Sequence, residues 1–150
     1  MTHEQLAMNF SKWQSQKAID AALAERTIAV VGLSSNPARP SHDVAKVMQD
    51  RGYRIVPINP RETSVLGEQS YPDLVTAAAA TGPINLVNVF RESSAVPAIA
   101  QDAVKLGARF LWLQLGVISE QGIAIAEAGG MTCVVDRCLK VEHLRRNARS

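Results

Sequence analysis

The stretch TIAVVGLSSNPARPS, residues 27–41, decides the fold class of this chain. It combines a short apolar strand, a turn rich in Gly, Ser and Asn, and the start of a helix. Such a junction presents backbone N–H groups and the positive end of a helix dipole to an anion. Arg39 follows the turn and adds positive charge. The pattern predicts a phosphate-binding turn made of Gly32, Leu33, Ser34, Ser35 and Asn36.

Short apolar runs rich in β-branched residues alternate with helical patterns along the rest of the chain. The expected strands are residues 28–31, 54–58, 84–90, 110–114 and 132–136. The expected helices are residues 14–25, 41–51, 71–81, 92–106, 119–128 and 138–149. Continuously apolar strands are typical of strands covered on both faces, and alternation with helices indicates parallel pairing. We therefore predict an α/β fold, a Rossmann-like doubly wound parallel sheet of five strands with helices on both faces.

Residues that favour helix ends agree with this division. Ser41 and Ser93 are expected to be N-caps. Gly52, Gly107 and Gly129 follow predicted helices, where a left-handed residue is favoured.

Size and composition point to one ordinary globular domain. The 150 residues are 47% hydrophobic and 20% charged, so we expect a single domain over residues 1–150, with mobile tails at about 1–14 and 147–150. A net charge of +2 and an aromatic content of 5% argue against a nucleic-acid partner. No apolar run approaches the roughly 20 residues that span a bilayer, and the N-terminus does not resemble a signal peptide. We expect a cytoplasmic protein with reduced cysteines and no membrane partner.

Polar side chains follow the predicted strands at one edge of the sheet. In doubly wound sheets, ligands bind beyond the carboxyl ends of the strands. The segments that meet there are residues 32–36, 59–61, 90–93, 115–117 and 137–138. The opposite edge, with Arg26, Arg54, Pro83 and Arg109, has the character of plain helix-to-strand turns.

The turn does not match the nucleotide motifs of the dehydrogenases. Gly32 is followed by Ser34 and Ser35, so the G-x-G-x-x-G pattern is not met. The second predicted strand ends in Asn59 and Pro60 rather than in the carboxylate that holds an NAD ribose, and Arg61 lies close by. A phosphorylated ribose suits this edge better than a free one. The P-loop pattern is also absent.

Coenzyme A has the chemistry that this edge can accept. The Ser34 and Ser35 hydroxyls suit its diphosphate, and Arg39, Arg61 and Arg91 offer forked, charge-assisted bonds to other phosphate oxygens. Coenzyme A or an acyl-CoA is therefore the expected ligand.

The chain resembles the small stand-alone CoA-binding proteins, whose domain is similar to the N-terminal CoA-binding domain of the succinyl-CoA ligase α subunit. The resemblance covers about residues 22–146. It is carried by the segments AVVGLSSNPARPSHDVA, GYRIVPINP, LGEQSYPDL, NVFRESSAVP, LWLQLGV and DRCLKVEHLR. It implies a Rossmann domain of the CoA-binding type. The ligase subunit also has a second domain with a phosphorylated histidine, which this chain lacks, so the resemblance implies binding and not ligase activity.

The resemblance also implies roles by position. The phosphate turn corresponds to Gly32, Ser34, Ser35 and Arg39, and the surroundings of adenine and ribose to Asn59 and Pro60. The FR pair after the third strand corresponds to Phe90 and Arg91, and the turn beside the pantetheine arm to Gln114, Leu115 and Gly116.

Cys138 leaves two interpretations open. It starts the last predicted helix, where the helix dipole favours a thiolate, and it lies at the ligand edge, so it could meet the CoA thiol or form a mixed disulfide with it. The plainer interpretation is a partly buried, unreactive thiol. Cys133, inside a strand, is expected in the core. The spacing of Cys133, Cys138 and His143 matches no zinc pattern, so no metal is expected.

Three functions remain open, in order of preference. The first is binding of CoA or an acyl-CoA without catalysis, with or without a separate protein partner, because the sequence contains no recognisable catalytic constellation. The second is an NADP-dependent reductase with a degenerate dinucleotide fingerprint. The third is an interaction scaffold whose nucleotide site is empty.

Overall fold

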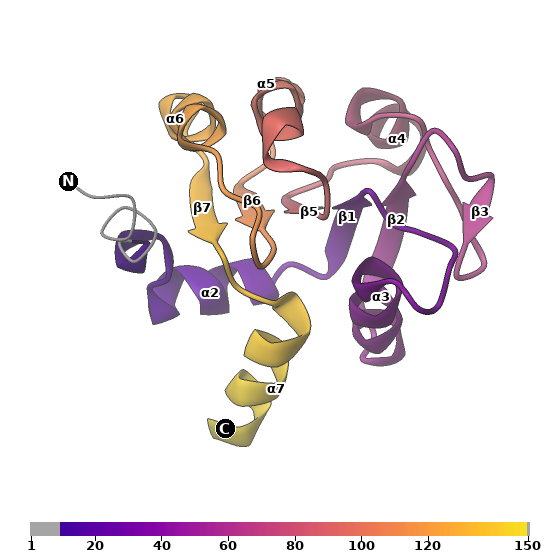
Figure 1. Cartoon of the computed structure of the whole chain (residues 1–150), viewed down its shortest axis with the longest axis horizontal. Helices are drawn as coiled ribbons and strands as arrows, with labels where there is room; N and C mark the ends of the chain where they lie inside the picture. The colour runs from indigo at the N-terminus through magenta and orange to yellow at the C-terminus, as the bar shows by residue number, and fades with distance from the viewer. Residues whose placement is uncertain (1–9, 150) are drawn as a thin grey trace.

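A five-stranded parallel sheet lies between two layers of helices in the computed structural model, which describes residues 10–149 (Figure 1). The strands are β1 (Thr27–Val31), β2 (Arg54–Ile58), β5 (Leu86–Val89), β6 (Phe110–Leu113) and β7 (Thr132–Val135), in the order β2-β1-β5-β6-β7. All four pairings are parallel. The strand order reverses at β1, which makes the sheet doubly wound, as predicted.

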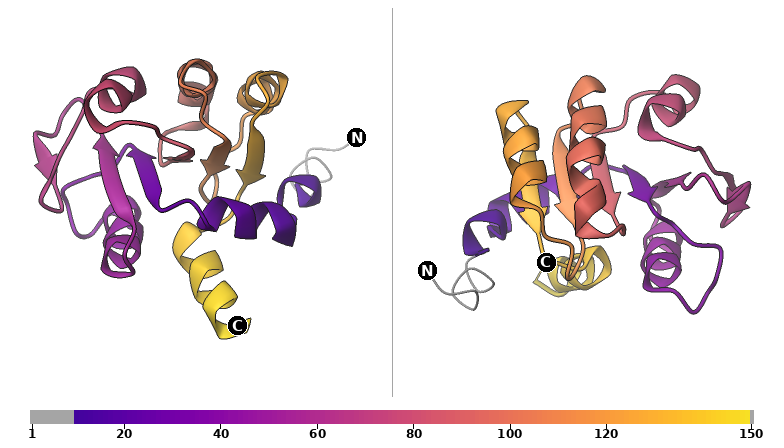
Figure 2. Two further views of the ribbon diagram at one scale, coloured as in Figure 1. Left: turned by 180° about the vertical axis from the view of Figure 1, so that it is seen from behind. Right: turned by 45° about the horizontal axis from the view of Figure 1, so that its top comes forward.

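The helices cover both faces of the sheet. They are α2 (Gln16–Leu23), α3 (Pro40–Asp50), α4 (Leu74–Thr81), α5 (Val96–Lys105), α6 (Glu120–Ala128) and α7 (Leu139–Arg149), with short 3-10 helices η1 (Ser11–Trp13) and η2 (Ser93–Ala95). Figures 1 and 2 show α4, α5 and α6 on one face and α2, α3 and α7 on the other. Each face has its own hydrophobic cluster, to which these helices contribute buried residues.

Strand β1 shows why the apolar runs form strands. Its side chains alternate between the two clusters: Ala29 and Val31 pack under α4–α6, and Ile28 and Val30 pack under α2, α3 and α7. Because successive side chains of a strand point to opposite faces, only a continuously apolar strand can serve both clusters. Burial of each large aliphatic side chain contributes about 1.5–3 kcal/mol.

A small antiparallel hairpin, which the sequence analysis did not predict, follows β2. Its strands are β3 (Ser64–Val65) and β4 (Glu68–Gln69). Leu66 and Gly67 between them have φ values of 55° and 77°, as a two-residue hairpin turn requires. Tyr71 then pairs with β2: its N–H donates to the Pro57 carbonyl at 3.0 Å. This segment covers the outer edge of β2, and α4 therefore begins later than expected.

Two serines expected as N-caps have other roles. Helix α3 begins at Pro40, so Ser41 lies inside it, and the Ser41 hydroxyl accepts the Ser34 N–H at 3.1 Å. Ser93 starts η2, and its hydroxyl accepts the Ile118 N–H at 2.9 Å. Both N-cap predictions are wrong, because the Ser41 hydroxyl joins α3 to the turn after β1 and the Ser93 hydroxyl joins η2 to the loop after β6.

The glycine predictions hold at two positions out of three. Gly52 and Gly107 are left-handed, with φ values of 95° and 75°. Gly129 has a φ of −87°, and Gly130 is the left-handed residue. Gly129 instead allows a close approach to α5, because a Cβ there would lie 2.5 Å from Val104.

The described parts of the expected tails form helices and contacts. Phe10 and Trp13 pack against the core, and the Gln14 side chain donates to the Val135 carbonyl at 2.9 Å. Helix α7 continues to Arg149, which forms an ion pair with Asp20 at 3.2 Å. The remaining tail residues, 1–9 and 150, lie outside the described part. Within residues 10–149 no helix has the length and apolar character needed to cross a bilayer.

Candidate functional site

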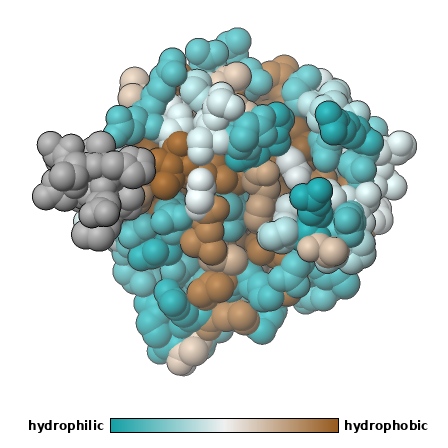
Figure 3. All heavy atoms as spheres, in the orientation of Figure 1, coloured by the Kyte–Doolittle hydropathy of each residue, from teal (hydrophilic) through white to brown (hydrophobic). Residues whose placement is uncertain are grey.

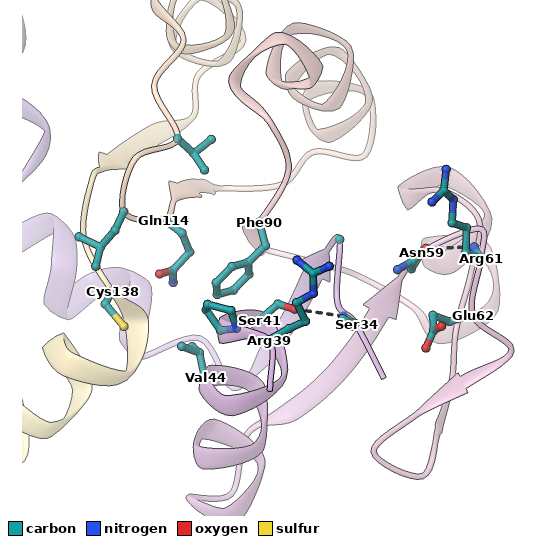
Figure 4. Close-up of a pocket in the computed structure, with 14 residues that line it drawn as sticks. Ser34, Arg39, Ser41, Val44, Asn59, Arg61, Glu62, Phe90, Gln114 and Cys138 are labelled. Atoms are coloured by element: carbon teal, nitrogen blue, oxygen red, sulfur yellow. Dashed lines mark hydrogen bonds between the residues drawn. The ribbon is translucent and has the colours of Figure 1, made fainter. Parts of the chain in front are cut away.

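A cavity of about 630 Å³ opens beyond the carboxyl ends of the central strands (Figure 4). It is lined by Gly32, Ser34, Arg39, Pro40, Ser41, Val44, Asn59, Arg61, Glu62, Phe90, Gln114, Leu115, Val117 and Cys138. A second hollow of about 450 Å³ shares some of this wall and is lined by Gly32, Ile58, Asn59, Pro60, Arg61, Arg91 and Glu92. Segments from β1, β2, β5, β6 and β7 thus meet at one edge, where the doubly wound topology places a ligand site.

Gly32 anchors the turn that enters this cavity. Its φ is 88°, and its N–H donates to the Ile58 carbonyl at 2.8 Å. A Cβ at this position would lie 2.9 Å from the carbonyl oxygen of Phe90. At the end of β1 the chain passes closely between the ends of β2 and β5. Only glycine fits there without displacing the neighbouring backbone.

Several backbone N–H groups of the turn after Gly32 donate hydrogen bonds to nearby side chains. The Ser34 N–H donates to Ser41, the Asn36 N–H donates to the Ser34 hydroxyl at 3.0 Å, and the Ala38 N–H donates to the Asn36 side chain at 3.0 Å. Ser and Asn side chains therefore satisfy several of the backbone N–H groups that the sequence predicted to face an anion. The amides of Ser35 and Ser41 have no acceptor within residues 10–149, and the Ser41 amide lies in the first turn of α3.

The structure brings most of the predicted site residues to the cavity and leaves a few outside it. The cavity includes Gly32, Ser34, Arg39, Asn59, Arg61, Phe90, Gln114, Leu115 and Cys138, and the second hollow adds Pro60 and Arg91. Neither is lined by Leu33, Ser35, Asn36 or Gly116. Leu33 is 0% exposed, since it belongs to the core under the turn. The Gly116 N–H donates to Asp136 at 2.8 Å, which joins the loops after β6 and β7.

Positive charge is concentrated where the phosphate groups were expected. Arg39 and Arg61 are exposed, and neither forms an ion pair with a carboxylate in the described part of the chain. Arg91 differs, because it pairs with Glu92 at 2.6 Å. That bond raises the pKa of Arg91 and lowers the pKa of Glu92. Arg39 and Arg61 are thus the guanidinium groups available to an anion.

Asn59 has a structural role at the end of β2. Its side-chain amide donates to the Leu33 carbonyl at 3.0 Å, and its side-chain oxygen accepts the Arg61 N–H at 3.0 Å. It therefore ties the turn after β1 to the loop after β2, and it holds the backbone of Arg61 beside the cavity.

The opposite part of the cavity is apolar. Val44, Phe90, Leu115 and Val117 line it, and Leu115 is 63% exposed. In Figure 3, apolar surface runs down the middle of the visible face, with hydrophilic atoms on both sides. The buried Gln114 lies here as well and donates to Asn88 at 3.2 Å. A long, mostly apolar ligand arm can lie along this wall.

Sequence reasoning missed several lining residues. Ser41 was assigned only to a helix cap and Val117 only to the ligand edge, as part of residues 115–117, while Pro40, Val44 and Glu62 were not assigned to the site. Each lies within five positions of a residue that was predicted. Which neighbours of a motif face a cavity depends on how helices and loops pack, and local spacing does not reveal it.

The two cysteines have different surroundings. Cys133 is buried in β7, as predicted, and burial together with the charge of Glu127 raises the pKa of its thiol to about 12. Cys138 is a free, partly buried thiol that immediately precedes α7 and lines the cavity. No cluster of His, Cys, Asp and Glu with metal-ligand geometry occurs among residues 10–149.

Comparison with known proteins finds a family model and several similar proteins. A family model described as a CoA binding domain matches residues 26–144. The Bacillus subtilis (strain 168) protein named Uncharacterized protein YneT is 41% identical over 118 residues, which cover 79% of this chain and 85% of that protein. A Thermus thermophilus structure described as cell-free ID.343 has 32% identity and a TM-score of 0.80, over 88% of this chain and 98% of that one. A hypothetical protein from Pyrococcus horikoshii OT3 has 29% identity and a TM-score of 0.82, over 87% of this chain and 91% of that one. The family match over most of the chain and the shared fold confirm the resemblance in the sequence: the chain belongs to the CoA-binding domain family.

Proposed function

We propose that this protein binds coenzyme A or an acyl-CoA in the cavity at the carboxyl ends of the strands, and that it catalyses no reaction there. The observation that carries the proposal is the polarity of the cavity. Unpaired guanidinium groups, Arg39 and Arg61, lie in the same cavity as an apolar wall formed by Val44, Phe90 and Val117. Coenzyme A has the matching division into a phosphorylated nucleotide and a long thin arm.

The phosphate groups are bound at the start of α3 and beside β2. The diphosphate lies near Arg39 and the amide of Ser41, where the positive end of α3 adds to the attraction. The ribose phosphate lies near Arg61, which Asn59 holds in place. A guanidinium–phosphate contact is a charge-assisted hydrogen bond and is stronger than a neutral one.

The arm of the coenzyme then follows the apolar wall toward Gln114. The gem-dimethyl group and methylene groups of the arm bury against Phe90 and Val117, at about 25 cal/mol per Å² of apolar surface. A wall of apolar side chains with a few fixed polar groups is typical of cofactor sites.

The side chains at the cavity support binding more than catalysis. Its charged or nucleophilic members are Arg39, Arg61, Glu62 and Cys138. A hydrogen bond to a neighbouring base is the usual way in which a nucleophile is activated. Among the described residues, no such bond joins the Cys138 thiol to a base. We propose that the protein binds the coenzyme in the cytoplasm, where cysteines stay reduced. We also propose that a separate protein receives the coenzyme from it.

Thermal unfolding with a panel of ligands tests the proposal. CoA at ~100 times its dissociation constant is expected to stabilise the fold by about 2.7 kcal/mol. Dephospho-CoA should bind more weakly, because it lacks the phosphate for Arg61, and Arg61→Ala should reduce this difference between the two ligands. A rise in melting temperature with NADPH alone would instead favour a reductase. No response to any ligand would favour a scaffold with an empty site.

A further inference from the structure

Cys138 lies at the apolar end of the cavity. Figure 4 shows its sulfur near Gln114 and Val44, while Asn59, Arg61 and Glu62 lie at the far end, with Phe90 between the two groups. The thiol is free and partly exposed. The cavity therefore has the cation of Arg61 at one end and an accessible thiol at the other.

Gln114 provides a second, independent indication that a ligand group reaches this end. The residue is 3% exposed, and its side-chain N–H donates to Asn88 at 3.2 Å. Its side-chain oxygen has no donor within residues 10–149, and Figure 4 shows this amide pointing into the cavity between Cys138 and Phe90. This oxygen faces the cavity, so an N–H or O–H group of the ligand arm can donate a hydrogen bond to it.

We infer that Cys138 exchanges with the disulfide of oxidised coenzyme A and carries the coenzyme as a mixed disulfide. The inference rests on the proposed CoA binding. The Cys138 thiolate attacks one sulfur of the CoA disulfide, so a new S–S bond forms between the protein and one CoA. The original S–S bond breaks, and the other CoA leaves as its thiolate. The CoA disulfide is the oxidant, and the thiol proton of Cys138 goes to solvent.

The polarity of the cavity determines which part of the coenzyme reaches Cys138. The phosphate groups are held by Arg39 and Arg61, and the arm lies along Phe90 and toward Gln114. The sulfur of coenzyme A is at the end of the arm remote from the phosphates. With the nucleotide bound at the cationic end, the sulfur is therefore carried toward the thiol end.

Cys133 offers a matched comparison within the same chain. It is 3% exposed inside β7, on the side of the sheet covered by α4–α6, and burial raises the pKa of its thiol to about 12. It does not line the cavity. A reaction guided by CoA binding should spare it, because exchange requires both access and the thiolate form.

Intact-protein mass spectrometry after incubation with CoA disulfide tests the inference. We expect one CoA attached to the wild type and to Cys133→Ser, and none attached to Cys138→Ser. The adduct should be removed by dithiothreitol. Glutathione disulfide, which lacks the nucleotide, should react at least ~10-fold more slowly, because it gains no effective concentration from binding. Acetyl-CoA, which has no free thiol, should slow the reaction by occupying the cavity.

Any one of four results would overturn the inference. They are the absence of an adduct, equal rates with CoA disulfide and glutathione disulfide, no protection by acetyl-CoA, and modification of Cys133. Thermal unfolding of the wild type with reduced CoA separates this failure from a failure of the proposed function. Stabilisation by reduced CoA without an adduct refutes only the exchange, whereas no stabilisation refutes the CoA binding itself.

Discussion

The substitution Gly32→Ala tests the claim that the end of β1 is squeezed between its neighbours. The added Cβ would lie 2.9 Å from the Phe90 carbonyl oxygen and 3.1 Å from Cδ of Arg91. The backbone cannot easily yield, because the Phe90 N–H donates to the Val31 carbonyl at 2.8 Å. Gly32 itself is bound to the end of β2 through the Ile58 carbonyl.

Two costs add at this position. A non-glycine residue in the left-handed region costs about 1–2 kcal/mol. Overpacking against fixed atoms adds typically ~1–3 kcal/mol, which gives a total loss of ~2–5 kcal/mol in the free energy of unfolding. Gly107→Ala is the matched control, since its φ is 75° but nothing lies within 4 Å of its Cβ. It should lose only the ~1–2 kcal/mol of the backbone term.

Urea unfolding without ligand measures both losses from the change in midpoint at constant slope. Calorimetric titration with CoA adds a functional measurement. Gly32→Ala should weaken CoA binding, because the turn must move away from Phe90, and Gly107→Ala should not. If Gly32→Ala loses no more stability than Gly107→Ala, the close packing described here is not present in solution.

Three further predictions concern other parts of the chain. Arg39→Ala should weaken CoA binding by roughly 10–100-fold, as expected for loss of a charged hydrogen bond of about 1.5–3 kcal/mol. In a calorimetric titration this loss should be smaller at high salt, and Arg54→Ala at the opposite edge should change CoA binding little. Trp112→Phe removes the donor to the Arg137 carbonyl at 2.8 Å and should lower the free energy of unfolding by about 1–3 kcal/mol in urea; an unchanged midpoint would contradict that role. Burial, with nearby guanidinium groups, lowers the pKa of His143 in the folded chain, so the unfolded chain binds this proton more readily. Stability should therefore fall as the pH drops below about 6.5, and His143→Gln should lessen this fall in unfolding curves measured across that range.

The strands could be predicted because their signal is local. An apolar run such as residues 28–31 has no exposed face to form, so a central position in a covered sheet suits it. The boundaries were less certain. The strand predicted over residues 132–136 ends at Val135, because Asp136 has a φ of 59° and its side chain binds Gly116 instead. A local pattern does not reveal where the ladder gives way to such a contact between loops.

Helix α4 shows a signal that was present but overlooked. The prediction started the helix at residue 71, whereas Asp73 caps it by accepting the Thr76 N–H at 2.7 Å. That bond also lowers the pKa of Asp73. An Asp just before an apolar, alanine-rich run is a recognisable start of a helix. Tyr71 belongs to the segment that pairs with β2, and only the pairing across the sheet edge reveals this.

The amino-acid sequence by itself determined the parallel α/β architecture, the strand–turn–helix junction at Gly32 and the family to which the chain belongs. These depend on hydrophobic periodicity and on short motifs, which act over a few neighbouring residues. Tertiary structure alone decided that Leu33 is buried, that Ser41 binds the turn, and that Gln114 and Cys138 share the apolar end of one cavity. The physical reason is that burial and hydrogen-bond partners come from segments distant in the chain, and the packing of the helices on the sheet sets which of them meet.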